Sequence, residues 1–229
     1  RYLSFGDIFM VFNNQKKGLE NVTDYHRGLD ISEAISTTSY TQDGTNFKRE
    51  TFSSYPDDVT VTHLSKKGDK TLDFTLWNSL TEDLLANGDY SWEYSKYKQG
   101  AVTTDSNGIL LKGTVKDNGL QFASYLGIKT DGQVTAQDGY LTVTGDSYAT
   151  LLLSAKTNFA QNPKTNYRKD IDVEKTVKSI VEAAKAKDYE TLKNDHIKDY
   201  QSLFNRVQLN LCGSKSNQTT KEALQTYNP

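Results

Sequence analysis

Three pairs of carboxylates stand close together in this 229-residue sequence. A glycosidase uses two such groups, one to protonate the leaving oxygen and one to activate water or attack the sugar. The two groups must lie a fixed distance apart across the scissile bond, and neighbours in the sequence do not establish that distance. We therefore interpret all three pairs as turn, loop or helix-cap residues and predict no catalytic residue here. The pairs are Asp57 with Asp58, Glu82 with Asp83, and Asp170 with Asp172.

Histidine and cysteine give no sign of a metal or cofactor. His26, His63 and His196 are too scattered to predict a metal site, and the first two fall in expected strands, where hydrogen-bonded packing is the favoured interpretation. Cys212 is the only cysteine, which excludes an internal disulfide and a cysteine-based zinc site. The sequence contains no G-x-S-x-G motif and no glycine-rich phosphate loop. We predict no cofactor and no metal.

Aromatic residues are the remaining candidates for chemistry. The chain has 14 Tyr, 9 Phe and 2 Trp, and Tyr90, Trp92, Tyr94 and Tyr97 gather between Asn87 and Thr104. Rings of this kind stack on sugars in carbohydrate-binding proteins, so one interpretation is a sugar-binding loop that these residues form, or a site that uses Trp77. The favoured interpretation is a strand edge with ordinary cross-strand aromatic pairs. The carbohydrate-binding residues therefore stay unknown.

Charge and hydropathy exclude several partners. Lys and Arg number 27 against 29 acidic residues, a net charge of −2, which gives no electrostatic reason to expect nucleic acid. The longest apolar run, residues 148–155, is too short to span a bilayer, so we predict no membrane insertion. The expected location is bacterial and extracellular or at the cell surface, with the cytoplasm as the alternative.

The elements that would position these residues are mostly strands. Apolar and polar residues alternate from Tyr2 to about Ala155, and Asn-Gly or Asp-Gly turns such as Asp43-Gly44 and Asp138-Gly139 interrupt the alternation. Repeated hairpin signals without helical spacing predict a mainly β fold, a large antiparallel β-sandwich over residues 1–168. The best-defined strands are expected at residues 47–54, 59–64, 70–80, 109–115, 120–128, 140–144 and 148–155.

The periodicity changes after Tyr167. Asp172 and Asp188 are expected to cap two helices, which form a helical linker over residues 169–205. Their apolar stripes should pack against each other or cover the sandwich. Alternation from Arg206 to Leu211 predicts a short returning strand in the last segment, 206–229, and the polar residues from Gly213 onward predict a linker or the start of a helix.

Several motifs together resemble the N-terminal domain of family 95 glycoside hydrolases, which are α-L-fucosidases. The resemblance runs through nearly the whole chain in the family's order. It departs at residues 218–224, which lack the family's Pro-Thr-Asp motif, and at residues 87–99, which resemble an insertion. The motifs are Tyr2-Leu3-Ser4-Phe5-Gly6-Asp7-Ile8, Tyr25-His26-Arg27-Gly28-Leu29-Asp30-Ile31, the run from Tyr40 to Tyr55-Pro56-Asp57, Thr157-Asn158-Phe159, and the run from His196 through Tyr200, Leu203 and Phe204 to Arg206-Val207.

The resemblance implies a non-catalytic domain and linker that precede an (α/α)6 barrel. The family hydrolyses α-1,2-linked fucose with inversion, and its catalytic residues belong to the barrel. The implied partners are therefore that barrel, absent from this chain, and a fucosylated glycan; the start of the N-terminal domain is also expected to be missing. Two alternatives remain, an independent carbohydrate-binding module and the equivalent domain of a disaccharide phosphorylase.

The helix that leads toward the barrel should carry part of the docking face. We therefore expect Tyr189, Tyr200 and Phe204 to be more exposed than an ordinary amphipathic pattern permits. Replacement of Leu203 by Ala is expected to cost roughly 2–5 kcal/mol if this side chain fills a core position.

Overall fold

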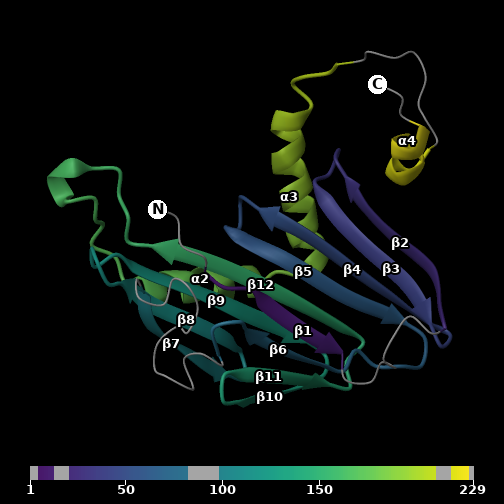
Figure 1. Ribbon diagram of the computed structural model, residues 1–229, viewed down its shortest axis with the longest axis horizontal. Helices are drawn as coiled ribbons and strands as arrows, with labels where there is room; N and C mark the ends of the chain where they lie inside the picture. Colours follow the sequence, from purple (N-terminus) through teal and green to yellow (C-terminus); the bar gives the residue numbers. More distant parts are fainter. Residues whose placement is uncertain (1–4, 13–20, 82–97, 210–217, 227–229) are drawn as a thin grey trace.

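The computed structural model describes residues 5–12, 21–81, 98–209 and 218–226 of the chain. The fold is mainly β, as predicted: the described residues form two antiparallel sheets, with α2 on the face of the larger sheet opposite the smaller one (Figure 1). The elements are β1 (Ile8–Phe12), β2 (Val22–Asp30), β3 (Ile35–Gln42), β4 (Thr45–Ser54), β5 (Val59–Lys67), β6 (Phe74–Asn78), β7 (Lys98–Asp105), β8 (Gly108–Val115), β9 (Gln121–Thr130), β10 (Gln133–Gln137), β11 (Tyr140–Thr144), β12 (Tyr148–Thr157), a 3₁₀ turn (Pro163–Thr165), α2 (Val173–Lys185), α3 (Tyr189–Phe204) and α4 (Thr220–Thr226).

The larger sheet has the strand order β2-β3-β4-β5-β12-β9-β8-β7, and the smaller has the order β1-β6-β11-β10. The alternation of apolar and polar residues along the strands explains why the two sheets stack. Phe74 and Leu76 of β6, with Leu141 and Val143 of β11, are fully buried, and Leu64 of β5 is among the residues that meet them from the larger sheet. Residues between these buried positions face away from the core, which is the period of two expected of a half-buried strand.

Two of the hairpins show why the predicted turns form. Asp43 and Gly44 have φ angles of 47° and 78°, and Asp138 and Gly139 have φ angles of 49° and 82°. Positive φ at both central residues is the requirement of a type I′ turn, whose twist matches that of the flanking strands. These turns set the register of β3 with β4 and of β10 with β11.

Helix α2 covers the other face of the larger sheet. The Asp172 carboxylate accepts a hydrogen bond of 3.0 Å from the Lys175 amide, as expected of an N-cap. Val177 and Val181 are fully buried in a core shared with β5, β9 and β12. Gly127 of β9 lets the helix approach, because a Cβ at this position would collide with the side chain of Val181. Helix α2 therefore covers the sandwich, which was one of the two packings predicted for the linker helices.

The end of the chain corrects one prediction. Residues 207–209 form no strand, and Val207 and Leu209 are 80% and 79% exposed, so alternation there does not reflect burial on a sheet. Residues 210–217, which include the rest of the predicted strand and Cys212, lie outside the described residues. A helix start was one of two alternatives for the polar tail, and α4 provides it.

None of the described helices has the length and hydrophobicity of a membrane span.

Candidate functional site

Helix α3 connects the sandwich to the C-terminal segment of the chain. Asp188 caps it by accepting a hydrogen bond of 2.6 Å from the Thr191 amide, as predicted. Leu192 and His196 are buried on one side of the helix, and the helix contacts strand β4. Its C-terminal end stands clear of the strands (Figure 1). The first half of the helix is therefore held on the sheet.

A column of stacked rings holds α3 on the sheet. The ring of Tyr189 lies 3.8 Å from that of His63 at an interplanar angle of 11°, and His196 stacks on Phe52 at 4.7 Å. Tyr200 continues the column beyond the sheet and stacks on Phe204 at 5.2 Å. Aromatic pairs of this kind add stability beyond the area they bury, so the column fixes the direction of the helix.

Charged groups lie beside this column. Glu50 accepts hydrogen bonds from Lys193 of α3 at 2.9 Å and from Lys48 at 3.0 Å. Burial would raise the pKa of the Glu50 carboxyl, but the two lysines outweigh it and leave the pKa below its ordinary value. Burial lowers the pKa of His63 to about 4, an effect that the charge of Glu50 partly opposes. Burial and, to a lesser degree, Glu50 raise the pKa of Tyr189.

The same helix clamps the turn between β2 and β3. Three side chains of α3 reach backbone carbonyls of that turn: His196 Nε2 lies 2.8 Å from the Glu33 oxygen, Tyr200 donates to Ile31 at 2.8 Å, and Gln201 donates to Ser32 at 3.0 Å. Three successive carbonyls are thereby satisfied by one helix. The turn and the second half of α3 consequently form one unit.

Apolar side chains are exposed on this unit. Leu203 and Phe204 are 57% and 40% exposed, and Ile31 of the clamped turn is 66% exposed. We call these three residues the docking face. The predicted exposure is confirmed for Phe204, whereas Tyr189 and Tyr200 are both half-buried, Tyr189 under the stacked ring of His63. Exposed apolar groups rimmed by polar ones are typical of surfaces that contact another protein or domain.

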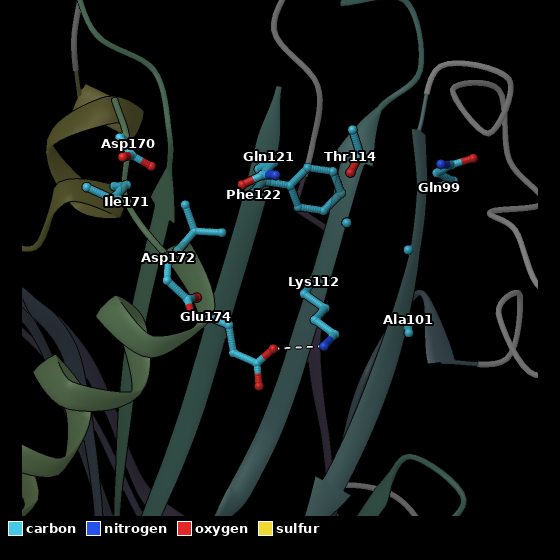
Figure 2. Close-up of a pocket in the computed structure, with 13 residues that line it drawn as sticks. Gln99, Ala101, Lys112, Thr114, Gln121, Phe122, Asp170, Ile171, Asp172 and Glu174 are labelled. Atoms are coloured by element: carbon cyan, nitrogen blue, oxygen red, sulfur yellow. Dashed lines mark hydrogen bonds and ion pairs between the residues drawn. The ribbon is translucent and has the colours of Figure 1, made fainter. Parts of the chain in front are cut away.

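A shallow hollow of about 820 Å³ lies between the start of α2 and strands β7 and β8 (Figure 2). It brings together Asp170, Asp172 and Glu174 with Lys112. Glu174 pairs with Lys112 at 2.8 Å and with Lys178 at 2.9 Å, and these bonds lower the pKa of its carboxyl. A general acid in glycoside hydrolysis requires a raised pKa, which Glu174 does not have. The carboxylate of Asp172 is already bound to the Lys175 amide in the helix cap. The hollow therefore lacks the features of a hydrolytic site.

Asp146 does have a raised pKa, of about 6, because it is buried. Its residue is fully inaccessible, and its Oδ2 accepts a hydrogen bond of 3.2 Å from Thr130. A group that no substrate can reach cannot protonate a leaving oxygen. No local pattern indicates this burial, because Asp146 follows Gly145 in a segment that resembles an ordinary turn.

Three other candidates, Asp57, Asp58 and His63, make structural contacts. Asp57 accepts hydrogen bonds from Ser54 at 2.7 Å and from Lys187 at 2.6 Å, and Asp58 pairs with Lys156. His63 is hydrogen-bonded to Thr150 at 2.8 Å, which confirms its packing role, whereas His26 is exposed on β2, so the predicted packing is wrong for that residue. Glu82, Asp83, Tyr90, Trp92, Tyr94 and Tyr97 lie outside the described residues. No group of three or more metal-ligating side chains occurs within the described ranges.

Comparison with known proteins agrees with this architecture. The family model described as "Glycosyl hydrolase family 65, N-terminal domain" matches residues 1–162. An "Alpha-L-fucosidase 2" from Arabidopsis thaliana is 27% identical over 98% of this chain and 28% of its own length. A "Probable alpha-fucosidase A" from Aspergillus niger is 27% identical over 91% of this chain and 26% of its own.

A solved structure shares the fold. It is named as a kojibiose phosphorylase, from the human microbiome, and it matches with a TM-score of 0.52 at 13% identity, over 79% of this chain and 23% of that one. The chain spans about a quarter of the length of the two fucosidase relatives. The matches together confirm the expectation of an N-terminal domain of a fucosidase-type glycoside hydrolase.

Proposed function

The chain belongs to the family of glycosyl hydrolase family 65 N-terminal domains, and we propose that it is the non-catalytic domain and linker of an α-L-fucosidase. In this proposal the sandwich supports a catalytic domain that removes α-1,2-linked fucose from glycans with inversion. The docking face of Ile31, Leu203 and Phe204 contacts that domain, and α3 sets its orientation.

One observation carries the proposal. The alignment with the Arabidopsis thaliana "Alpha-L-fucosidase 2" covers 98% of this chain but only 28% of that protein. Most of such an enzyme is therefore available to hold the catalytic groups. The described carboxylates also support catalysis outside this chain. Asp57, Asp172 and Glu174 are engaged in turn, cap and ion-pair contacts.

The first experiment measures fucose release from 2′-fucosyllactose by the purified chain alone. We expect none, because Asp57, Asp172 and Glu174 are engaged in turn, cap and ion-pair contacts and the catalytic groups are proposed to lie in another domain. A complete α-L-fucosidase is the positive control. Release by the chain that is lost on replacing Asp57 or Asp170 by Asn would contradict the proposal, since it would place catalysis inside the sandwich.

The alternative, a phosphorylase, would transfer the sugar to phosphate, whereas a hydrolase transfers it to water. The kojibiose phosphorylase likeness, at 13% identity, concerns the fold and does not favour phosphorolysis. We propose hydrolysis, so fucose release by the polypeptide that carries this domain should not depend on phosphate. Formation of a sugar phosphate in place of the free sugar would identify the phosphorylase class and overturn the fucosidase assignment.

A further inference from the structure

The outer face of the four-stranded sheet carries a row of aromatic rings. Phe9 of β1 is the register partner of Trp77 of β6, and Trp77 is the partner of Tyr140 of β11. The ring centroids lie 5.4 Å apart for Phe9 and Trp77 and 5.7 Å apart for Trp77 and Tyr140. All three side chains are on the face away from the core, and Phe9 is 46% exposed. Neighbouring strands lie about 4.8 Å apart, so the row follows directly from the register.

Hydrogen-bonding groups flank the rings. Gln137 of β10 is the register partner of Tyr140 and ends the aromatic row. The next outward row contains Thr75 and Thr142, whose hydroxyl oxygens lie 3.4 Å apart, followed by Thr135 of β10. Amide and hydroxyl groups can donate and accept hydrogen bonds without a charge. We call this surface the ring platform; its residues are Phe9, Thr75, Trp77, Thr135, Gln137, Tyr140 and Thr142.

The four strands that form the platform contain no Asp, Glu, Lys, Arg or His, although 24% of the chain is Asp, Glu, Lys or Arg. Their outward-facing positions are Phe, Val, Thr, Trp, Tyr and Gln. A phosphate-bearing ligand would find no cation on these strands, and the carboxylate of Asp138, in the turn after β10, accepts a hydrogen bond of 3.2 Å from the Gln137 amide. Charge complementarity therefore selects a neutral ligand that has both apolar and hydroxylated surface.

We propose that the ring platform is a binding site for neutral oligosaccharide. A pyranose has an apolar face of C–H groups, which packs on aromatic rings, and equatorial hydroxyls at its rim, which suit Gln and Thr. The row extends across three adjacent strands, so it accommodates successive sugars of a chain lying across the sheet. This inference does not rest on the proposed function, because it concerns a surface on the opposite side of the larger sheet from α2 and needs no catalysis.

Tryptophan fluorescence provides a direct test. The chain has two tryptophans, so Trp92→Phe leaves Trp77 as the single reporter. Titration of this variant with 2′-fucosyllactose, and separately with lactose, is expected to give a saturable change with a dissociation constant on the order of 1 mM. Glycerol at equal mass concentration is the control for solvent effects. Absence of a saturable change with both sugars would overturn the proposal.

A matched pair of variants locates the binding. Tyr140→Thr removes a platform ring, and Tyr25→Thr removes an exposed ring from β2, outside the platform; Thr suits a strand in both cases. We expect about a tenfold weaker affinity for Tyr140→Thr and no change for Tyr25→Thr. Circular dichroism and thermal unfolding verify that both variants are folded. Equal weakening by both, or by neither, would exclude the platform as the site.

Two other occupants of the ring platform would give different results in these experiments. If a second copy covered the platform, the Trp77 signal would depend on protein concentration without sugar, and sedimentation would show a dimer that Tyr140→Thr disrupts. If another domain of the same polypeptide covered it, the isolated chain would bind sugar but the longer polypeptide would not. Either result would contradict a glycan site on this surface in the intact protein.

Discussion

Two buried ionisable groups in this domain change its stability in opposite directions as pH changes. The pKa of His63 is lowered to about 4, and the pKa of Asp146 is raised to about 6, in each case mainly by burial. Burial disfavours the charged form, which is the cation for histidine and the anion for aspartate. The two residues therefore affect stability with opposite signs across overlapping pH ranges.

His63 contributes stability that is lost on acidification. Between about pH 6.5 and pH 4 the unfolded chain binds a proton that the folded chain does not, so the free energy of unfolding rises with pH in this window. We expect His63→Gln to remove this rise, which is worth about 1–2 kcal/mol between pH 5 and pH 7. Urea denaturation at a series of pH values measures it. A variant with the same pH slope as the parent would show that His63 titrates normally.

Asp146 acts in the other direction. Between about pH 3.8 and pH 6 the folded chain binds a proton that the unfolded chain has lost, so stability falls as pH rises through this window. We expect Asp146→Asn to remove that fall, so that its stability rises more steeply from pH 5 to pH 7 than that of the parent chain, by about 1 kcal/mol. The same urea series provides the comparison. A parallel pH profile would rule out a raised pKa.

Among the elements, α3 has two halves with different environments. Leu192 is fully buried against the larger sheet, whereas Leu203 is more than half exposed. The sequence-based expectation of a 2–5 kcal/mol cost therefore belongs to Leu192 and not to Leu203. The amphipathic stripe continues along the helix, but the sheet that it would cover ends first.

A pair of alanine variants tests this division. Leu192→Ala should reduce the free energy of unfolding by roughly 2–5 kcal/mol, because it leaves a cavity in the core. Leu203→Ala should change it by less than about 0.5 kcal/mol, as expected of an exposed position. Chemical denaturation of both variants gives the two values. Similar losses for both would show that the far half of the helix is also packed.

Local patterns accounted for most of the elements but not for their partners. The caps Asp172 and Asp188 and the Asp-Gly hairpins were predictable, because each depends on a few neighbouring residues. The sequence did not predict the lysine partners of Glu50, nor the row that Phe9, Trp77 and Tyr140 form. Both depend on which distant strands pair. Residues 206–209 alternate like a strand, yet no described strand pairs with them.

At the scale of the whole molecule, the central strands carry two cores. Strands β5, β9 and β12 contribute to the apolar cluster under α2 on one face and to the cluster between the sheets on the other. Among the described strands, an edge strand such as β2 pairs with one neighbour, and its residues are mostly exposed. Because β5, β9 and β12 are buried on both faces, we expect the centre of the larger sheet to be the most stable part of the domain.

Amide hydrogen exchange should reveal this gradient. We expect the slowest exchange in β5, β9 and β12, where opening requires both cores to separate, and much faster exchange in β2 and α4. Mass spectrometry of peptic peptides resolves these segments. Uniform protection across the sheet would mean that the domain opens only as a whole.

The clamp on the β2–β3 turn also makes the exit point of the chain rigid. Tyr200 and Gln201, which donate to the turn, stand within four residues of Phe204, the last residue of α3. An α-helix rises 1.5 Å per residue, so only about 6 Å of helix extends past Tyr200. The stacked rings and these hydrogen bonds together fix the direction in which the chain leaves the domain. Because the acceptors are backbone carbonyls, substitution of Tyr200 or Gln201, and not of the turn residues, would disturb that direction.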